Sequence, residues 1–260
     1  MRNLDVIVPA GGRCDDTLKR IVNVENKALI KFGEHTILKT TINALRSSGR
    51  VRRIVLIGSE DIEKSEEARR VDQFLPEGKT GPENIFLGLE WLEKQSDPPS
   101  HVMIVTSDLP FLTAEVINKF LDLCPEGADF CVPLVSQADF LDVYPTADAT
   151  FVKLLDGTWT TGCAYVATAP ALRKAVRHIN KVFKNRKSKL GMARVLGIGF
   201  VYRLLVQKLT VPDVEKKVQD LLQVNGVAVR NSPAQLSYDI DYQDDYYYAL
   251  NNLASHPRAL

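Results

Sequence analysis

A short apolar run, Leu4–Pro9, ends in the small residues Ala10-Gly11-Gly12. A strand that ends in this way leaves backbone N–H groups uncovered, and such groups can bind phosphate oxygens. Arg13 follows directly and could add charge-assisted hydrogen bonds. The pattern is neither a GxxxxGK[ST] loop nor a GxGxxG fingerprint, and it also fits an ordinary strand-ending turn. A phosphate site is therefore one of two interpretations at this point.

Lys27 is the second residue that could do chemistry. It follows a polar loop and precedes an apolar stretch, in Glu25-Asn26-Lys27-Ala28-Leu29. If the chain returns this side chain to the Gly-rich turn, its ammonium would neutralise a triphosphate as a compact point charge. A solvated surface lysine is the alternative, and spacing alone does not decide between them.

Carboxylates follow in two places. Asp108 comes just after the apolar run His101–Thr106, where it could hold a hard cation against phosphate or simply cap a turn. Asp239-Ile240-Asp241 is a second acidic segment, which could supply another ligand or cap the last helix. Two carboxylates from distant parts of the chain suit Mg²⁺, which keeps several waters and completes its shell with substrate phosphates.

The elements around these residues alternate between strand and helix patterns. Apolar runs predict strands over residues 4–9, 51–58, 71–75, 101–106 and 128–135, and helical spacing or charge predicts helices near 37–48, 60–70, 82–94 and 114–123. This alternation predicts an α/β protein with a mostly parallel sheet that is covered on both faces. Ligands of such sheets bind beyond the carboxyl ends of the strands, where both the Gly-rich turn and Asp108 fall.

The second half of the chain is less regular. Strands are expected over residues 150–155 and 160–168, as a hairpin around Asp156-Gly157, with a last strand over 226–230. Helices are expected over residues 170–183, 189–207, 213–223 and 242–253. Because no repeat or low-complexity linker interrupts the chain, we expect a single domain over residues 1–260 with a basic helical elaboration at about 170–223.

The charge is balanced overall but not along the chain. A formal net charge of +1 gives no bias toward nucleic acid. The stretch Gly157–Pro212 contains no Asp or Glu, yet it carries Arg173, Lys174, Arg177, Lys181, Lys184, Arg186, Lys187, Lys189, Arg194, Arg203 and Lys208. This stretch could form a basic wall for an anionic acceptor, rest on an anionic membrane surface, or be a solvated helix face.

Cysteine usage and hydropathy point to a location. The four cysteines are scattered and include no CxxC pair, so neither a zinc site nor a disulfide framework is expected. The apolar stretch Val195–Val206 is too short to span a bilayer, and the N-terminus lacks the apolar core of a signal peptide. We expect a cytoplasmic protein; its oligomeric state does not follow from the sequence.

Taken together, the motifs resemble those of the MobA-like NTP transferases, which include cytidylyl- and sugar-phosphate nucleotidyltransferases. The resemblance rests on four segments in the family's order: Val8-Pro9-Ala10-Gly11-Gly12, Asn26-Lys27-Ala28-Leu29, Ser107-Asp108-Leu109-Pro110-Phe111-Leu112 and Asp239-Ile240-Asp241-Tyr242-Gln243-Asp244-Asp245. It implies a three-layer α/β/α sandwich of the glycosyltransferase-A type with a helical C-terminal elaboration.

The resemblance also implies roles for individual residues. The turn Ala10-Gly11-Gly12 would embrace the nucleotide, and Lys27 would contact its phosphates. Asp108 and Asp241 would hold Mg²⁺, with Asp239 the less favoured alternative to Asp241. Residues near the base or ribose in this family would correspond here to Gly81 and Asn84.

Three departures from the family pattern are visible. The Gly-rich turn continues as Arg13-Cys14-Asp15-Asp16 instead of a small residue and an Arg, Asn26 stands where Pro is common, and Tyr242-Gln243 replaces Thr-Pro.

The expected reaction is transfer of an NMP unit from an NTP to a phosphorylated or hydroxyl acceptor, with release of pyrophosphate, and the expected partners are the NTP and an anionic small-molecule acceptor. Lys27, Arg13 and Asp108 would act in catalysis, and Mg²⁺ would be the cofactor. A glycosyltransferase of the same fold would use a sugar nucleotide and normally a DxD pair, of which Asp108-Leu109-Pro110 has one carboxylate. A nucleotide-binding regulator without catalysis is the other alternative.

Overall fold

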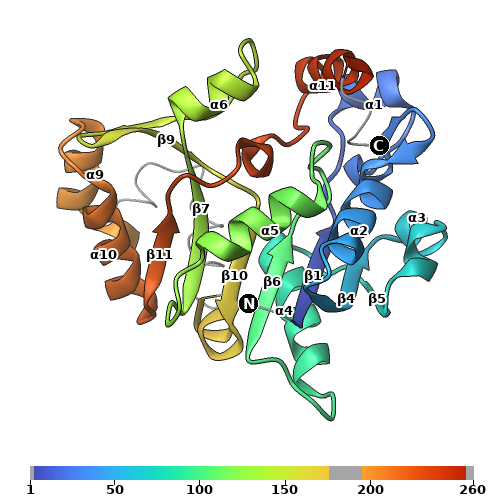
Figure 1. The fold of residues 1–260 in the computed structure, drawn as a ribbon, viewed down its shortest axis with the longest axis horizontal. Helices are drawn as coiled ribbons and strands as arrows, with labels where there is room; N and C mark the ends of the chain where they lie inside the picture. The colour runs from blue at the N-terminus through green and yellow to red at the C-terminus, as the bar shows by residue number, and fades with distance from the viewer. Residues whose placement is uncertain (1–2, 176–194, 256–260) are drawn as a thin grey trace.

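One mixed sheet of nine strands organises the computed structural model, which describes residues 3–175 and 195–255 (Figure 1). Its strand order is β5 (Gln73–Pro76), β4 (Val51–Gly58), β1 (Leu4–Ala10), β6 (His101–Val105), β10 (Ala164–Thr168), β7 (Phe130–Ser136), β9 (Gly157–Thr161) and β8 (Val152–Leu154), and β11 (Gly226–Val229) pairs with β7.

Parallel pairing dominates the part of the sheet that carries the Gly-rich turn and Asp108. Strand β1 runs parallel to both β4 and β6, and β4 runs parallel to β5. Strand β10 lies antiparallel between β6 and β7, and β11 is parallel to β7. The predicted mostly parallel sheet is confirmed. The C-terminal ends of β1 and β6 consequently lie at the same edge of the sheet.

Helices cover both faces of this sheet. Helices α2 (Ile37–Ser47) and α5 (Ala114–Leu123) lie on one face and α4 (Gly81–Glu93) on the other (Figure 1). Successive side chains of a strand point to opposite faces. In β1, Val6 and Val8 pack in the core under α2 and α5, whereas Ile7 packs with Leu89 of α4. The expected α/β/α sandwich is confirmed.

Two sequence-based boundaries were wrong. Residues 60–70 do not form one solvated helix but α3 (Glu60–Glu63) and a 3-10 turn (Glu67–Arg70), because Glu67 is buried and accepts a hydrogen bond from Thr36 Oγ1 at 2.6 Å. Residues 160–168 are not one strand, since the chain passes from β9 to β10 at Gly162. A Cβ there would lie 2.7 Å from the carbonyl oxygen of Leu236.

The smaller elements include three that the periodicity did not indicate: α1 (Asp16–Val22), α6 (Gln137–Val143) and the short pair β2 (Lys31–Phe32) and β3 (His35–Thr36). A 3-10 turn, η1, spans Lys27–Leu29, and another, η3, spans Ala234–Ser237.

The second half of the chain extends the sheet beyond β6, and its C-terminal helix returns to the first half, beside α1 (Figure 1). Strands β8 and β9 make the predicted hairpin. Helices α9 (Ile198–Leu205), α10 (Val211–Leu222) and α11 (Gln243–Ser255) follow. Residues 169–175 are helical, and the rest of the helix expected over 170–183 lies outside the described residues. The helix expected over 189–207 is described only from residue 195, and Gly197, with φ +90°, separates residues 195–196 from α9. No helix within the described ranges is long and apolar enough to cross a bilayer.

Candidate active site

Asn26 fastens the Gly-rich turn to the segment that carries Lys27. The side chain of Asn26 is buried; its Nδ2 donates to the carbonyl oxygen of Ala10 at 2.7 Å, and its Oδ1 accepts from the N–H of Ala28 at 2.9 Å. The N–H of Lys27 also donates to the carbonyl oxygen of Gly12 at 3.0 Å. The sequence showed Asn26 only as a departure from the family pattern, and the structure gives it this positioning role.

The two glycines of the turn differ in what surrounds them. A Cβ at Gly11 would lie 2.7 Å from Oε2 of Glu77 and 3.0 Å from Nδ2 of Asn84, so a larger residue there would push the ends of these two side chains away from the turn. A Cβ at Gly12 would make an ordinary contact with the side chain of Lys27, at 3.6 Å. The first glycine therefore lets Glu77 and Asn84 lie close to the turn, and the second has no such steric requirement.

Arg13 does not point freely into the site. Its guanidinium forms an ion pair with the carboxylate of Glu77, and its Nη1 donates to the carbonyl oxygen of Gly11 at 3.1 Å. Nothing in the sequence pattern indicated Glu77, which follows β5. A phosphate that bound Arg13 would have to compete with this carboxylate.

Asn84 lies beside the Gly-rich turn, as its expected role near the nucleotide requires. It is buried, and its Oδ1 accepts from the N–H of Gly78 at 2.7 Å, which orders the loop after β5. Gly81 begins α4, and an added Cβ there would meet no atom within 4 Å. The structure brings Asn84 to the turn and gives Gly81 no contact with it.

Asp108 follows β6 at the same edge of the sheet. The hydroxyl of the neighbouring Ser107 donates to the carbonyl oxygen of Pro9 at 3.3 Å, which ties this segment to the end of β1. The carbonyl oxygen of Asp108 accepts from the N–H of Ile240 at 3.1 Å, which ties it to the C-terminal acidic segment. Its carboxylate atom Oδ1 is buried and has no hydrogen-bond partner of normal geometry. Burial raises the pKa of Asp108, against the opposing effects of the neighbouring Thr106 hydroxyl and of the positive charge of Lys27.

Lys27 pairs with Asp241. Its Nζ donates to Oδ1 of Asp241, and the exposed fractions of the two side chains are 11% and 56%. Burial alone would lower the pKa of Lys27, but the hydrogen bond and charge of Asp241, with smaller contributions from Asp108 and Asp239, leave that pKa raised. The lysine is therefore a cation held among three carboxylates.

Two further carboxylates belong to this cluster. Burial raises the pKa of Asp239 to about 7, and the negative charges of Asp108 and Asp241 add to the effect. Asp245 accepts from the N–H groups of Asp241 and Tyr242 at 2.9 and 2.7 Å, at the start of α11. Asp245, the last residue of the fourth motif, thus caps the start of α11 and fixes the backbone of Asp241.

The donor chemistry fits a hard divalent cation. The unpartnered Oδ1 of Asp108 and the mutual repulsion of the neighbouring carboxylates are both relieved when a cation binds between them. Within the described ranges, no group of three or more His, Cys, Asp and Glu side chains has the geometry of a complete metal site. A site with two protein carboxylates, completed by water and phosphate, agrees with both observations.

Two cations of the basic stretch are paired with carboxylates in the described part of the chain. Arg173 forms an ion pair with Glu93, and Arg203 pairs with Asp213 at 3.2 Å. Its cations between residues 177 and 194 lie outside the described residues.

An edge of a mostly parallel sheet that joins a Gly-rich turn, a buried lysine and remote carboxylates defines the nucleotidyltransferase class of α/β proteins. Residues 6–188 match the MobA-like NTP transferase domain. The chain belongs to this family. A search of curated proteins found no match.

Solved structures agree with this assignment. A hypothetical transferase from Thermus thermophilus is 26% identical, with 94% of this chain and 99% of that chain covered and a TM-score of 0.81. A nucleotidyl transferase from Methanothermobacter is 13% identical, with 98% and 99% covered and a TM-score of 0.59. The 2-C-methyl-D-erythritol 4-phosphate cytidylyltransferase of Thermus thermophilus is 15% identical, with 97% and 99% covered and a TM-score of 0.53. The latter two share the fold.

Proposed function

We propose that the protein transfers an NMP unit from an NTP to an oxygen acceptor and releases pyrophosphate, in a single domain with Mg²⁺ as cofactor. The observation that carries this is the convergence of the four motifs. Lys27 pairs with Asp241, the chain at Lys27 is bonded to Gly12, and Asp108 is bonded through the backbone to Ile240. A ligand that is an anion with a bound metal ion would contact all of these groups at once: the turn and Lys27 would bind its negative charge, and the carboxylates would bind the metal ion.

Each group has a distinct part in the proposed reaction. The backbone at Gly11 and Gly12 and the ammonium of Lys27 would bind and orient the triphosphate. Asp108 and Asp241 would hold Mg²⁺, which when bound polarises the α-phosphate as a Lewis acid. The ion pair between Arg13 and Glu77 would break when the nucleotide binds, and the Arg13 guanidinium would then contact the β- and γ-phosphates.

The acceptor oxygen attacks the α-phosphorus and forms a new P–O bond, while the bond to the β-phosphate oxygen breaks and pyrophosphate leaves with the electron pair. An acceptor that is already an anion, such as a phosphate monoester, needs no general base. Catalysis then rests on position and charge neutralisation, which are the effects this site provides.

The test is thermal stability and pyrophosphate release with a panel of GTP, CTP, UTP and ATP in the presence of Mg²⁺. A ligand at a hundredfold excess over its Kd stabilises the folded state by roughly 2.7 kcal/mol, which raises Tm by about 5–10 °C for a chain of this size. We expect one of the four NTPs to raise the Tm of the parent protein in this way, and we expect no such rise in Tm for Lys27→Ala.

The rival functions give different results in the same assay. A glycosyltransferase would be stabilised by a sugar nucleotide rather than by an NTP. A regulator would bind an NTP and release no pyrophosphate with any acceptor. Either result would refute the proposed reaction.

A further inference from the structure

A large cavity begins at the carboxylates of the candidate active site and extends into the second half of the chain. Its volume is about 880 Å³, which is within the range of small-molecule sites. Asp239 and Asp241 line one end, and strands β7, β8, β9 and β11 with helices α9 and α10 form the walls. The cavity and the proposed reaction site are therefore continuous.

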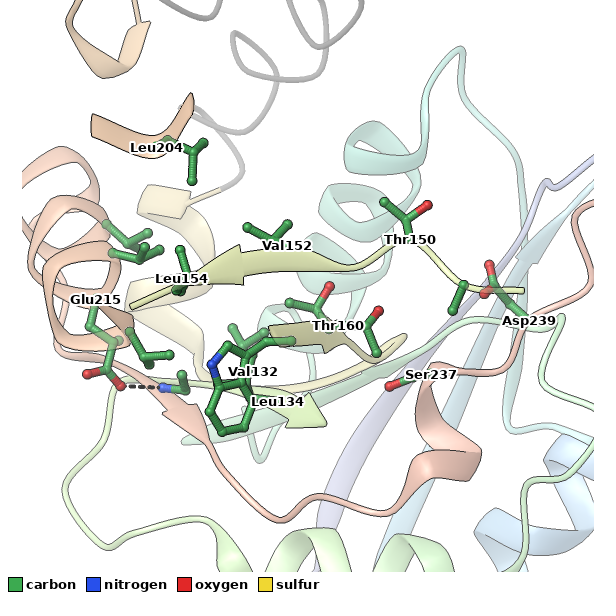
Figure 2. A pocket seen from close by; sticks show the side chains of 18 of the residues that line it. Val132, Leu134, Thr150, Val152, Leu154, Thr160, Leu204, Glu215, Ser237 and Asp239 are labelled. Atoms are coloured by element: carbon green, nitrogen blue, oxygen red, sulfur yellow. Dashed lines mark hydrogen bonds between the residues drawn. The ribbon is translucent and has the colours of Figure 1, made fainter. Parts of the chain in front are cut away.

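The end that lies away from Asp239 is apolar. Figure 2 shows Leu154 and Leu204 at this end, opposite Asp239. Glu215 is also there, but its Oε1 accepts from the N–H of Ala228 at 2.7 Å, so its carboxylate is engaged within the protein. Such a wall binds hydrocarbon and offers little to a sugar or a nucleotide base.

The end near Asp239 is polar. Thr150, Thr160 and Ser237 lie between the apolar wall and Asp239 (Figure 2). Ser237 is itself buried and its hydroxyl has no hydrogen-bond partner within the described residues. The polar character of this end rests on the hydroxyls of Thr150 and Thr160 together with the carboxylate of Asp239.

We propose that the acceptor is an amphiphile whose hydrocarbon tail occupies the apolar end of this cavity and whose oxygen nucleophile lies at the Asp239 end. The inference rests on the proposed function and names its substrate class: an alkyl or acyl-chain phosphate or alcohol. For an alkyl phosphate, a phosphate oxygen forms the bond to the α-phosphorus, pyrophosphate leaves, and the product is an alkyl nucleoside diphosphate diester.

Helix α9 adds an observation of its own. Phe200 and Leu204 pack inward against the apolar cluster at the cavity, yet Ile198, Tyr202 and Leu205 on the outer side are 79%, 64% and 71% exposed. An ordinary surface helix is polar on its outer side. A helix that is apolar on both sides, next to the cavity, fits a tail that is taken from a lipid surface.

The first experiment measures binding without nucleotide. Trp159 lines the cavity, and a Trp91→Phe background makes it the sole tryptophan reporter. We titrate this Trp91→Phe protein with monoalkyl phosphates and with the matching alkan-1-ols and follow the fluorescence of Trp159. The tails have about two to ten carbons, and every concentration stays below the critical micelle concentration. Each methylene that enters the cavity should lower Kd by about fourfold.

Two variants isolate the cavity. Val152→Glu places a charge on a wall residue that is already partly exposed, so the fold should persist while the dependence on tail length disappears. Leu155→Glu is the matched control, because Leu155 is 67% exposed and is not part of the wall. It should bind every tail as the parent protein does.

The second experiment adds each NTP with Mg²⁺ and measures pyrophosphate release. Tail-length-dependent binding together with pyrophosphate release supports the inference. A Kd for the alkyl compounds that does not depend on tail length overturns the inference. The proposed function would still stand in that case if the parent protein binds an NTP and Lys27→Ala does not. Tail-dependent binding without transfer from any NTP refutes the acceptor role of the amphiphile, whereas the proposed function fails only if no NTP binds or no acceptor of any class yields pyrophosphate.

A vesicle assay separates the two sources of such a tail. Phosphatidylcholine vesicles that contain a minor fraction of a long-chain phosphate are sedimented with the protein and with Ile198→Ser/Leu205→Ser. Co-sedimentation that is lost in this variant assigns a membrane-borne acceptor. Binding of the free alkyl phosphates with no co-sedimentation assigns a soluble amphiphile.

Discussion

Lys27 and Asp241 form an ion pair across 214 positions of sequence, and in the proposed reaction the same two groups serve triphosphate and metal. Under the proposed function, we expect the pair to be a resting arrangement in which the lysine substitutes for the cation that its carboxylate neighbours would bind. The positive charge of Lys27 also acts to lower the pKa values of Asp108 and Asp239, against the larger effect of burial.

Lys27→Ala should lower kcat/KM by about 10²–10³-fold, the effect of losing one charge contact to the reacting phosphates. The variant also leaves Asp241 without its partner, so Mg²⁺ should raise the Tm of Lys27→Ala more than that of the parent protein. Scanning calorimetry with and without Mg²⁺ measures this. Lys19→Ala removes an exposed lysine that pairs with Glu25 and should change neither quantity. Equal Mg²⁺ responses in the three proteins would contradict the resting arrangement.

Asp108→Asn should be inactive and yet more stable without metal. The buried Oδ1 has no hydrogen-bond partner, and its carboxylate lies close enough to Asp239 and Asp241 to raise the pKa of Asp239. An amide removes that charge, which should raise stability by about 1 kcal/mol, or 2–4 °C in Tm. Calorimetry in EDTA and the pyrophosphate assay give the two readouts. A lower Tm would show that the carboxylate is stabilised by contacts other than a cation.

Asp5→Asn is the contrasting substitution, because Asp5 is a buried carboxylate that is fully paired. Its carboxylate accepts from the guanidinium groups of Arg52 and Arg53, at 2.6–3.1 Å. Burial opposes ionisation, but these arginines hold the pKa of Asp5 below its usual value. Loss of one partner of a buried pair should cost about 3 kcal/mol, or roughly 6–12 °C in Tm.

The pH dependence of that loss follows from the lowered pKa. The folded state binds the proton of Asp5 less readily than the unfolded state, so the stabilisation is present above a pH of about 4 and is lost as pH falls through the folded pKa. Melting curves of the parent protein and Asp5→Asn should therefore converge in acid. A constant difference in Tm down to the lowest accessible pH would refute the ionic origin of the effect.

The part of this architecture that the sequence could predict is the part with strong local signals. The apolar run of β1 and the helical spacing of α2 and α5 are properties of contiguous residues. The strand break at Gly162 is not a property of contiguous residues. It depends on the carbonyl group of Leu236, which lies next to Gly162 only in the folded chain. Periodicity in residues 60–70 likewise could not show that Glu67 is buried against Thr36.

The candidate site divides in the same way. Lys27, Asp108 and Asp241 could be selected because their motifs resemble those of a family, and the fold brings their segments together. Asn26 and Glu77 could not, since a buried amide and a surface carboxylate acquire their roles from partners that are far away in the chain. Such roles are set by tertiary contacts and leave no local pattern.

Asn26→Ala should loosen the Gly-rich turn. It removes the donor to the Ala10 carbonyl and the acceptor of the Ala28 N–H, which should cost about 2 kcal/mol, or 4–8 °C in Tm, and raise the KM for NTP. Asn26→Asp keeps the acceptor but sets a carboxylate against a carbonyl, so it should be no better than Ala. Calorimetry and NTP titration test both variants. A near-normal Asn26→Asp would mean that the contact with Ala10 does not position the turn.

Glu77→Gln should strengthen NTP binding. In the structure, Glu77 occupies the guanidinium of Arg13 at the same turn that we propose binds phosphate, so a triphosphate must displace a carboxylate before it gains this cation. Because both side chains are partly exposed, the effect should be modest, about 1 kcal/mol or fivefold in Kd, and should shrink as salt is added. Glu60→Gln, which removes an exposed carboxylate paired with Lys64, should leave Kd unchanged.

Isothermal titration with the preferred NTP at two salt concentrations distinguishes the roles open to this carboxylate. A lower Kd in Glu77→Gln means that Glu77 competes with phosphate for Arg13. A higher Kd means that it receives hydrogen bonds from the nucleotide itself, which would make the approach of Gly11 to Glu77 part of the binding surface. In that case Arg13→Ala should cost little affinity, because its partner in the bound state would still be the protein and not the triphosphate.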